Sequence, residues 1–298
     1  MSGGRIVAIG SVSRSGRSTR SSGSDGDIIT AGLINTHHHF YHGWMTRGWA
    51  FDCTLFGWLT ALYPVWARIT PEDVESRLGR GRGDASPDRH ARPPPTMHYV
   101  VPGGDDSVFD AIASAARTIG IRLTIARRLH GPGPEQKGAC PGLGGRELDA
   151  ILASTGIGPS AAANGDRIVV TVAPCSPFSR HHGADDGLRR SWLTAPRGSA
   201  APIWPDLDEE QSCLQRFGKR PLAVLDGDGL DRPDVWVAHG IHFDDAEVAR
   251  AWLGETRTGI AHCPSQRFAG SGRASRGLSD LTAAGGPVGL GVDGVAAQ

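Results

Sequence analysis

The chain alternates between short, continuous apolar runs and longer segments in which apolar residues recur every three or four positions. Runs without internal alternation are typical of strands that are buried on both faces. These runs predict strands at 28–34, 121–126, 167–173, 235–238, 258–261 and 287–292. A further short strand is predicted between the glycines of 4–10.

The segments between these runs have the features of helices. Thr70, followed by a proline and two acidic residues, predicts a helix start, because threonine caps a helix and proline suits its first turn. The periodic segments 108–119 and 206–217 each precede a glycine, the residue favoured just after a helix. The aromatic-rich segment 51–66 predicts a short helix that ends near Pro64, lying either in the core or over a pocket.

Buried strands that are separated by helices indicate a parallel sheet. Several of the predicted strands end in chemically reactive residues, which is the pattern of a (β/α)8 barrel. A doubly wound sheet is the alternative, but it would place a glycine-rich phosphate loop after its first strand. Here the first strand is followed by three histidines at 37–39, so we predict a (β/α)8 barrel of the TIM type.

The composition excludes several classes of protein. Lys and Arg number 31, as do Asp and Glu, so the formal net charge of zero favours neither nucleic acid nor an anionic membrane. No apolar run approaches the roughly 20 residues of a membrane span, and the N-terminus lacks the apolar stretch of a signal peptide. The five cysteines have no paired spacing, which predicts neither disulfides nor a cysteine zinc site. A reduced, cytoplasmic setting is expected, and homo-oligomer formation stays open.

The candidate chemistry lies at the predicted strand ends. On a strand, His37 and His39 face one side and His38 the other. His239 and Asp293 follow two later strands, and His262 follows a third. Imidazoles together with a carboxylate suit a single Zn²⁺, with Fe²⁺ as the alternative.

Such a group predicts hydrolysis at an electrophilic carbon. A bound divalent ion lowers the pKa of water to roughly 7. Asp293 is placed to take the water proton, and His239 to hydrogen-bond the water or the developing oxyanion. The other histidines are interpreted as structural or solvated, and Cys263 as a small buried thiol.

Four motifs point to a known family: AGLINTHHH at 31–39, VAHGIHF at 237–243, IAHCPS at 260–265 and GLGVDG at 289–294. Together they resemble the strand ends of the amidohydrolase superfamily. LYPVWAR at 62–68 and APCSPFS at 173–179 resemble a narrower branch, that of 8-oxoguanine deaminase and hydroxydechloroatrazine ethylaminohydrolase.

The resemblance implies an amidohydrolase barrel over 28–298 and a small partial β-sandwich that includes 1–27. It implies one metal ion held by His37, His39, Asp293 and a histidine of the fifth strand, with His239 beside the hydrolytic water. Asp293 would deprotonate that water, and a fifth-strand glutamate would protonate a ring nitrogen of the substrate. The implied partners are water and an amino-substituted purine, pyrimidine or triazine.

The chain departs from this family at the fifth strand. The family motif there is His-Leu-Ala-Glu, whereas 201–206 reads APIWPD. One hypothesis is that 11–26, 77–97 and 180–205 are frameshifted stretches, which an unbroken reading frame in resequenced DNA would refute. Both termini also look shorter than those of family members.

Three functions follow from these observations. The first is a metal-dependent hydrolytic deaminase of an amino-substituted heterocycle, similar to 8-oxoguanine deaminase. The second is an impaired amidohydrolase fragment that lacks the third histidine ligand and the acid. The third is a triazine amine hydrolase, which would release an amine in place of ammonia.

Overall fold

The computed structural model divides the chain into two units, 1–31 and 32–298. The residues that it describes all belong to the second unit. The predicted strand at 4–10, the 1–27 sandwich segment and most of the predicted strand at 28–34 lie outside them, and the domain boundary after residue 27 stays a prediction. The described residues are 34–40, 49–50, 53, 55–66, 68–80, 96–99, 107–129, 168–174, 199–203, 207–227, 232–239, 254–263, 279, 282–283 and 285–293.

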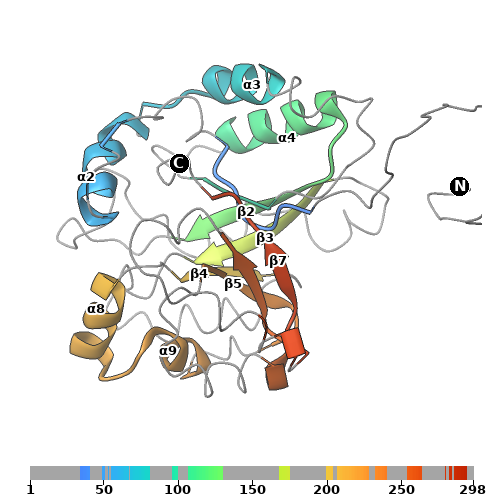
Figure 1. Cartoon of the computed structure of the whole chain (residues 1–298). Coiled ribbons are helices and arrows are strands. Elements are labelled where there is room, and N and C mark those ends of the chain that lie inside the picture. The colour runs from blue at the N-terminus through green and yellow to red at the C-terminus, as the bar shows by residue number, and fades with distance from the viewer. Residues whose placement is uncertain are drawn as a thin grey trace, which may run out of the picture. The chain divides into compact units, whose positions relative to one another are not determined.

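The described part of this unit consists of helices and parallel strands (Figure 1). The longer helices are α2 (Leu55–Trp66), α3 (Pro71–Arg80), α4 (Ser107–Ile119), α8 (Leu207–Phe217) and α9 (Pro221–Gly227). The strands are β1 (Thr96–Tyr99), β2 (Leu123–Leu129), β3 (Ile168–Pro174), β4 (Ser199–Ile203), β5 (Val235–His239), β6 (Gly259–His262) and β7 (Val288–Leu290).

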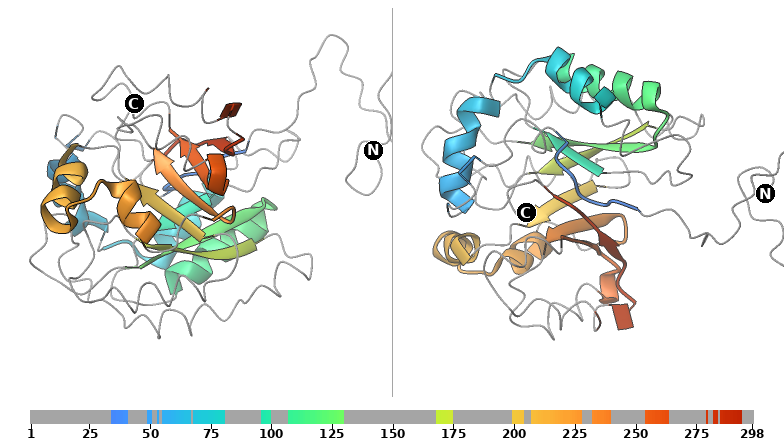
Figure 2. Two further views of the ribbon diagram at one scale, coloured as in Figure 1. Left: turned by 90° about the horizontal axis from the view of Figure 1, so that it is seen from below. Right: turned by 45° about the horizontal axis from the view of Figure 1, so that its top comes forward.

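The described strands form two sheets, β1-β2-β3 and β4-β5-β6-β7, and every pairing is parallel. β3 and β4 are neighbours at the junction of the two sheets (Figure 2). Residues 34–40 run beside β7 through parallel bridges from Asn35 to Leu290 and from His38 to Asp293. The first and last extended segments therefore meet, as a barrel requires, but the described residues do not form a closed barrel.

The helix boundaries confirm most of the sequence predictions. At the start of α3, the backbone N–H of Asp73 donates to Thr70 Oγ1 at 3.2 Å, and the N–H of Thr70 donates to Asp73 Oδ2 at 3.1 Å. α4 and α8 are followed directly by Gly120 and Gly218, whose φ angles of 79° and 64° favour glycine. The reciprocal hydrogen bonds of Thr70 and Asp73 satisfy backbone groups that α3 itself leaves unpaired.

The predicted end of α2 near Pro64 is two residues too early. The helix includes Pro64 and continues to Trp66. Proline lacks the N–H of its own turn, but Leu62 and Trp66 are both fully buried and hold this last turn against the core. The core interpretation of the segment is therefore confirmed.

One apolar core lies between these helices and the first sheet. Helices α3 and α4 cover the outer face of β2 and β3 (Figure 1). Ile112 and Ala116 of α4 are buried against Leu123 and Ile125 of β2. Burying such side chains stabilises the fold by roughly 1.5–3 kcal/mol each.

Among the described residues, no helix is long and apolar enough to cross a bilayer.

Three described elements were not predicted: β1, β4 and α9. The stretch 180–205 has no apolar pattern, yet it contains β4, which pairs with β5 in register from Ser199 with Val235 to Ile203 with His239. A strand can form there because its ladder uses backbone groups, which every residue of β4 except Pro202 supplies in full. The short helix α9 follows α8 directly and was missed because seven residues give too little periodicity.

The cap of α3 gives a test of the fold. We expect Thr70→Ala to lower the free energy of unfolding by about 1 kcal/mol, because the N–H of Asp73 loses its acceptor. Thr70→Ser is the matched control, since it keeps the hydroxyl oxygen and should change the stability far less. Urea denaturation followed by circular dichroism measures both, and equal effects of the two substitutions would contradict the capping role.

Candidate metal centre

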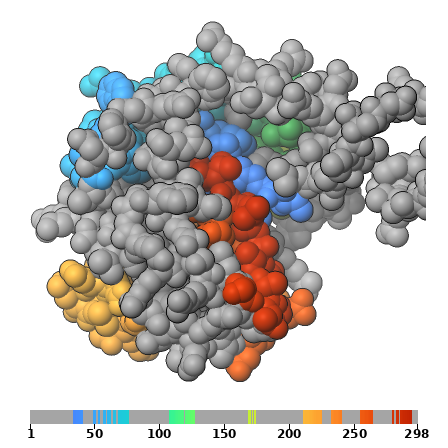
Figure 3. Space-filling model, in the orientation of Figure 1, coloured from blue at the N-terminus to red at the C-terminus, as the bar shows by residue number. Residues whose placement is uncertain are grey.

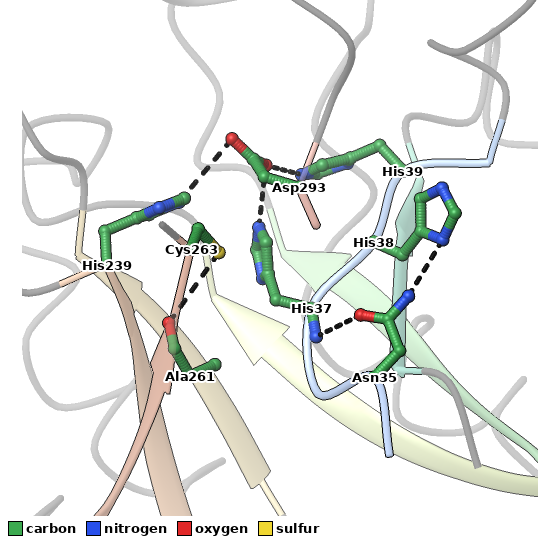
Figure 4. A network of polar contacts seen from close by, with 8 residues as sticks. All are labelled: Asn35, His37, His38, His39, His239, Ala261, Cys263 and Asp293. Carbon is green, nitrogen blue, oxygen red and sulfur yellow. Dashed lines mark hydrogen bonds and ion pairs between the residues drawn. The ribbon is translucent and has the colours of Figure 1, made fainter. Parts of the chain in front are cut away.

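The candidate residues come from strand ends that are far apart in the sequence. His239 is the last residue of β5 and His262 the last of β6. Asp293 follows β7 by three residues, and His37 and His39 lie on the segment beside it. Figure 4 shows His37, His39 and His239 directed toward the Asp293 carboxylate. All five side chains are buried.

A ladder of backbone hydrogen bonds fixes the first segment against the end of β7. The N–H of Thr36 donates to Leu290 O at 2.8 Å, and the N–H groups of Val292 and Asp293 both donate to His37 O at 3.0 Å. The N–H of His39 donates to Asp293 O at 3.3 Å. The two segments lie side by side in the space-filling view (Figure 3). Their side chains are therefore placed by paired backbone and not by a loop.

The Asp293 carboxylate is the centre of the group. His37 Nε2 lies 2.9 Å and His39 Nε2 lies 3.2 Å from Asp293 Oδ1. His239 Nε2 lies 3.9 Å from Asp293 Oδ2, on the other oxygen. The rings of His39 and His239 both stand nearly perpendicular to that of His37, with centroids 5.0 and 4.9 Å away. Three imidazoles thus surround one carboxylate.

The backbone is strained at two of these residues. His239 and Asp293 have φ angles of 69° and 56°, in the left-handed region that residues with a Cβ rarely adopt. Such conformations cost about 1–3 kcal/mol each and persist where surrounding structure enforces them. Because such strain is common at functional sites, its presence at both strand ends makes this edge of the sheet a candidate functional site.

The electrostatics favour an anionic Asp293 carboxylate and a neutral His239 imidazole. Burial alone would raise the pKa of Asp293, but nearby His239 and the hydrogen bonds from His37 and His39 lower this pKa well below its ordinary range. Burial lowers the pKa of His239 to about 3, against the opposing influence of Asp293. Neutral imidazole and ionised carboxylate are the forms that bind metal ions.

His38 and Cys263 stand outside the group, as the sequence predicted. His38 points away from Asp293, and its Nδ1 accepts a hydrogen bond of 3.0 Å from Asn35 Nδ2. Burial, followed by the proximity of His39 and His37, lowers the pKa of His38 to about 4. Cys263 is fully buried, its thiol lies 3.7 Å from Ala261 O, and burial raises its pKa.

The donor set fits a zinc ion. One ligand atom from each of His37, His239 and Asp293 can be chosen so that all lie within 4.8 Å of one another. Two imidazole nitrogens and one carboxylate oxygen are a usual ligand set for Zn²⁺ that leaves a further position open. His39 contacts the same carboxylate, whereas His262 is buried on β6 outside the group.

Comparisons with known proteins identify the family of the chain. The chain is 38% identical over 288 residues to 8-oxoguanine deaminase from Pseudomonas aeruginosa, covering 91% of the chain and 60% of that protein. It is 28% identical to hydroxydechloroatrazine ethylaminohydrolase from Pseudomonas sp. strain ADP, covering 90% of the chain and 56% of that protein. The chain belongs to the amidohydrolase superfamily. No protein-family model matches it.

Solved structures of amidohydrolases share its fold. Atrazine chlorohydrolase from Arthrobacter aurescens TC1, complexed with zinc, matches with a TM-score of 0.74 at 20% identity, covering 90% of this chain and 60% of that one. An adenosine deaminase from Xanthomonas campestris with bound zinc matches with a TM-score of 0.68 at 22% identity, covering 90% and 56%. These TIM-barrel enzymes support the predicted fold class. The amidohydrolase chain spans about 60% of the length of the relatives that it matches.

Sequence reasoning missed the residues that position the histidines around Asp293. Asn35 Oδ1 accepts the N–H of His37 at 3.3 Å while its amide holds His38. A Cβ at Gly291 would lie 2.8 Å from His37 Cβ and 2.9 Å from Cys263 Sγ. The alternate glycines of GLGVDG could have revealed this, because glycine in a strand often marks close approach of another backbone.

Gly291 provides the test of this positioning. We expect Gly291→Ala to lower the free energy of unfolding by about 1–3 kcal/mol, because the added methyl group overpacks against His37. Chemical denaturation measures the loss, and NMR of ¹⁵N-labelled histidine reports displacement of the His37 ring. Gly291→Ala combined with Cys263→Ala should recover only part of the loss, since the contact with His37 remains. Unchanged stability in the single variant would contradict the close packing.

Proposed function

We propose that this amidohydrolase is a metal-dependent hydrolytic deaminase that acts on a C–N bond of an amino-substituted heterocycle, similar to 8-oxoguanine deaminase. The observation that carries the proposal is the convergence of His37, His39 and His239 on the buried Asp293 carboxylate. The named relatives support the substrate class, since they are deaminases and aminohydrolases. We also propose that the whole chain completes a (β/α)8 barrel with a partial sandwich.

The proposed cofactor is one zinc ion, with ferrous iron as the alternative, held by His37, His39 and Asp293 together with a further histidine. When bound, the ion supplies Lewis-acid activation of water. Asp293, anionic and buried, accepts the proton that water loses as it adds to the ring carbon. Asp293 then passes this proton to the amino group, the carbon–nitrogen bond breaks, ammonia leaves, and the carbon keeps the oxygen.

A triazine amine hydrolase is the second candidate. It is favoured by the identity to hydroxydechloroatrazine ethylaminohydrolase and by the likeness to a variant of atrazine chlorohydrolase that was solved with zinc and atraton. The same residues would hydrolyse a ring C–N bond in both candidates, and only the leaving group differs. The impaired-fragment alternative predicts no turnover of either substrate.

The test is an assay of the zinc-loaded full chain with 8-oxoguanine, isocytosine and an N-ethyl-substituted hydroxytriazine. Release of ammonia from a purine or pyrimidine supports the deaminase, and release of ethylamine supports the triazine hydrolase. We expect Asp293→Asn to lower kcat by at least about 100-fold, because it removes the proton acceptor. His38→Asn is the control, since His38 points away from the group. A folded, zinc-loaded chain that releases neither product contradicts both candidates.

A further inference from the structure

The strand at the family's fifth-strand position is β4 in this chain, and it has no side chain that could hold a metal ion. β4 reads Ser-Ala-Ala-Pro-Ile, without imidazole, thiol or carboxylate. It occupies the position next to β5, and its last residue, Ile203, pairs in register with His239. The strand is therefore present where the family resemblance places a third histidine ligand, but the ligand is not.

His239 lies where it can take over that role. Its ring stands 4.9 Å from that of His37, and its Nε2 approaches the carboxylate oxygen of Asp293 that faces away from His37 and His39. Among the described residues, His37, His239 and Asp293 are the three whose ligand atoms come within 4.8 Å of one another. His239 is the last residue of β5, and its φ angle of 69° lies in the left-handed region.

We infer that His239 is a metal ligand in this chain, sharing the ion with His37, His39 and Asp293 in place of the missing fifth-strand histidine. This inference rests on the proposed metal-dependent function. It changes the role predicted for His239 from the sequence, because an Nε2 that coordinates the ion is no longer available to hydrogen-bond the water. Three imidazoles and one carboxylate still leave room for water, because a catalytic zinc site can expand to five ligands.

Zinc binding by the purified full chain tests this assignment. The affinity is measured by competition with a chelator, and His37→Ala serves as the reference for loss of a ligand. We expect His239→Ala to weaken zinc binding by more than about 100-fold, since losses of outer-shell partners already cost about 10–100-fold. His38→Asn is the matched control and should stay within about 10-fold of the wild type. A His239→Ala variant that binds zinc as well as this control overturns the inference.

A second variant gives a readout that a structural role of His239 would not produce. His239→Cys keeps a donor, and X-ray absorption at the zinc edge should then show a sulfur neighbour at about 2.3 Å. This measurement decides the question if His239→Ala fails to fold. Zinc bound without a sulfur neighbour overturns the inference, as does a wild-type chain that binds no zinc.

The two proposals fail in different ways. A sulfur neighbour in His239→Cys, with no ammonia or amine released by the wild type, supports the ligand role of His239 and contradicts the proposed function. Product release by the zinc-loaded wild type, with no sulfur neighbour in His239→Cys, supports the function and overturns the ligand role.

Discussion

The Asp293 carboxylate accepts hydrogen bonds from His37 and His39 at a place almost fully buried from solvent. A buried charge is costly unless it is paired and hydrogen-bonded. The imidazoles must therefore be held close to it, and the surrounding backbone meets that requirement. The bonds from Val292 and Asp293 to His37 O tie the two segments together at the same point. The pairing of segment 34–40 with the segment after β7 therefore also brings the site residues together.

Close backbone packing is the condition for this arrangement. Gly291 lies against His37 and Cys263 at distances that leave no room for a methyl group. Its N–H also donates to His262 O at 2.8 Å, which joins the end of β6 to the same network. The site is stiff because strand ends, rather than long loops, supply its residues.

The departure from the family lies at one strand and leaves the rest of the site in place. β4 takes its position beside β5 with a sequence that offers no ligand. The donors of the first segment, β5 and the end of β7 still converge. Metal binding can therefore be tested separately from turnover in this amidohydrolase. A chain can retain enough donors for an ion while it lacks the acid that a ring nitrogen would need.

The sequence by itself determined the local structure and the kinds of chemistry. Apolar runs located β3, β5 and β6 to within about a residue, and turn chemistry located the start of α3 at Thr70, because these features depend on near neighbours. The strand-end histidines and Asp293 were identified because their positions after apolar runs can be read from the local sequence. The motifs that contain them indicated the family.

Only the tertiary structure decided which of these residues meet. It placed His239 rather than His262 in the group with His37 and Asp293, although both histidines end a buried strand. That choice depends on strand register, ring orientation and left-handed backbone, which arise from contacts across more than 200 residues of sequence. It also formed β4 where no side-chain pattern predicted a strand, because backbone pairing with β5 is set by the neighbouring strand and not by local sequence.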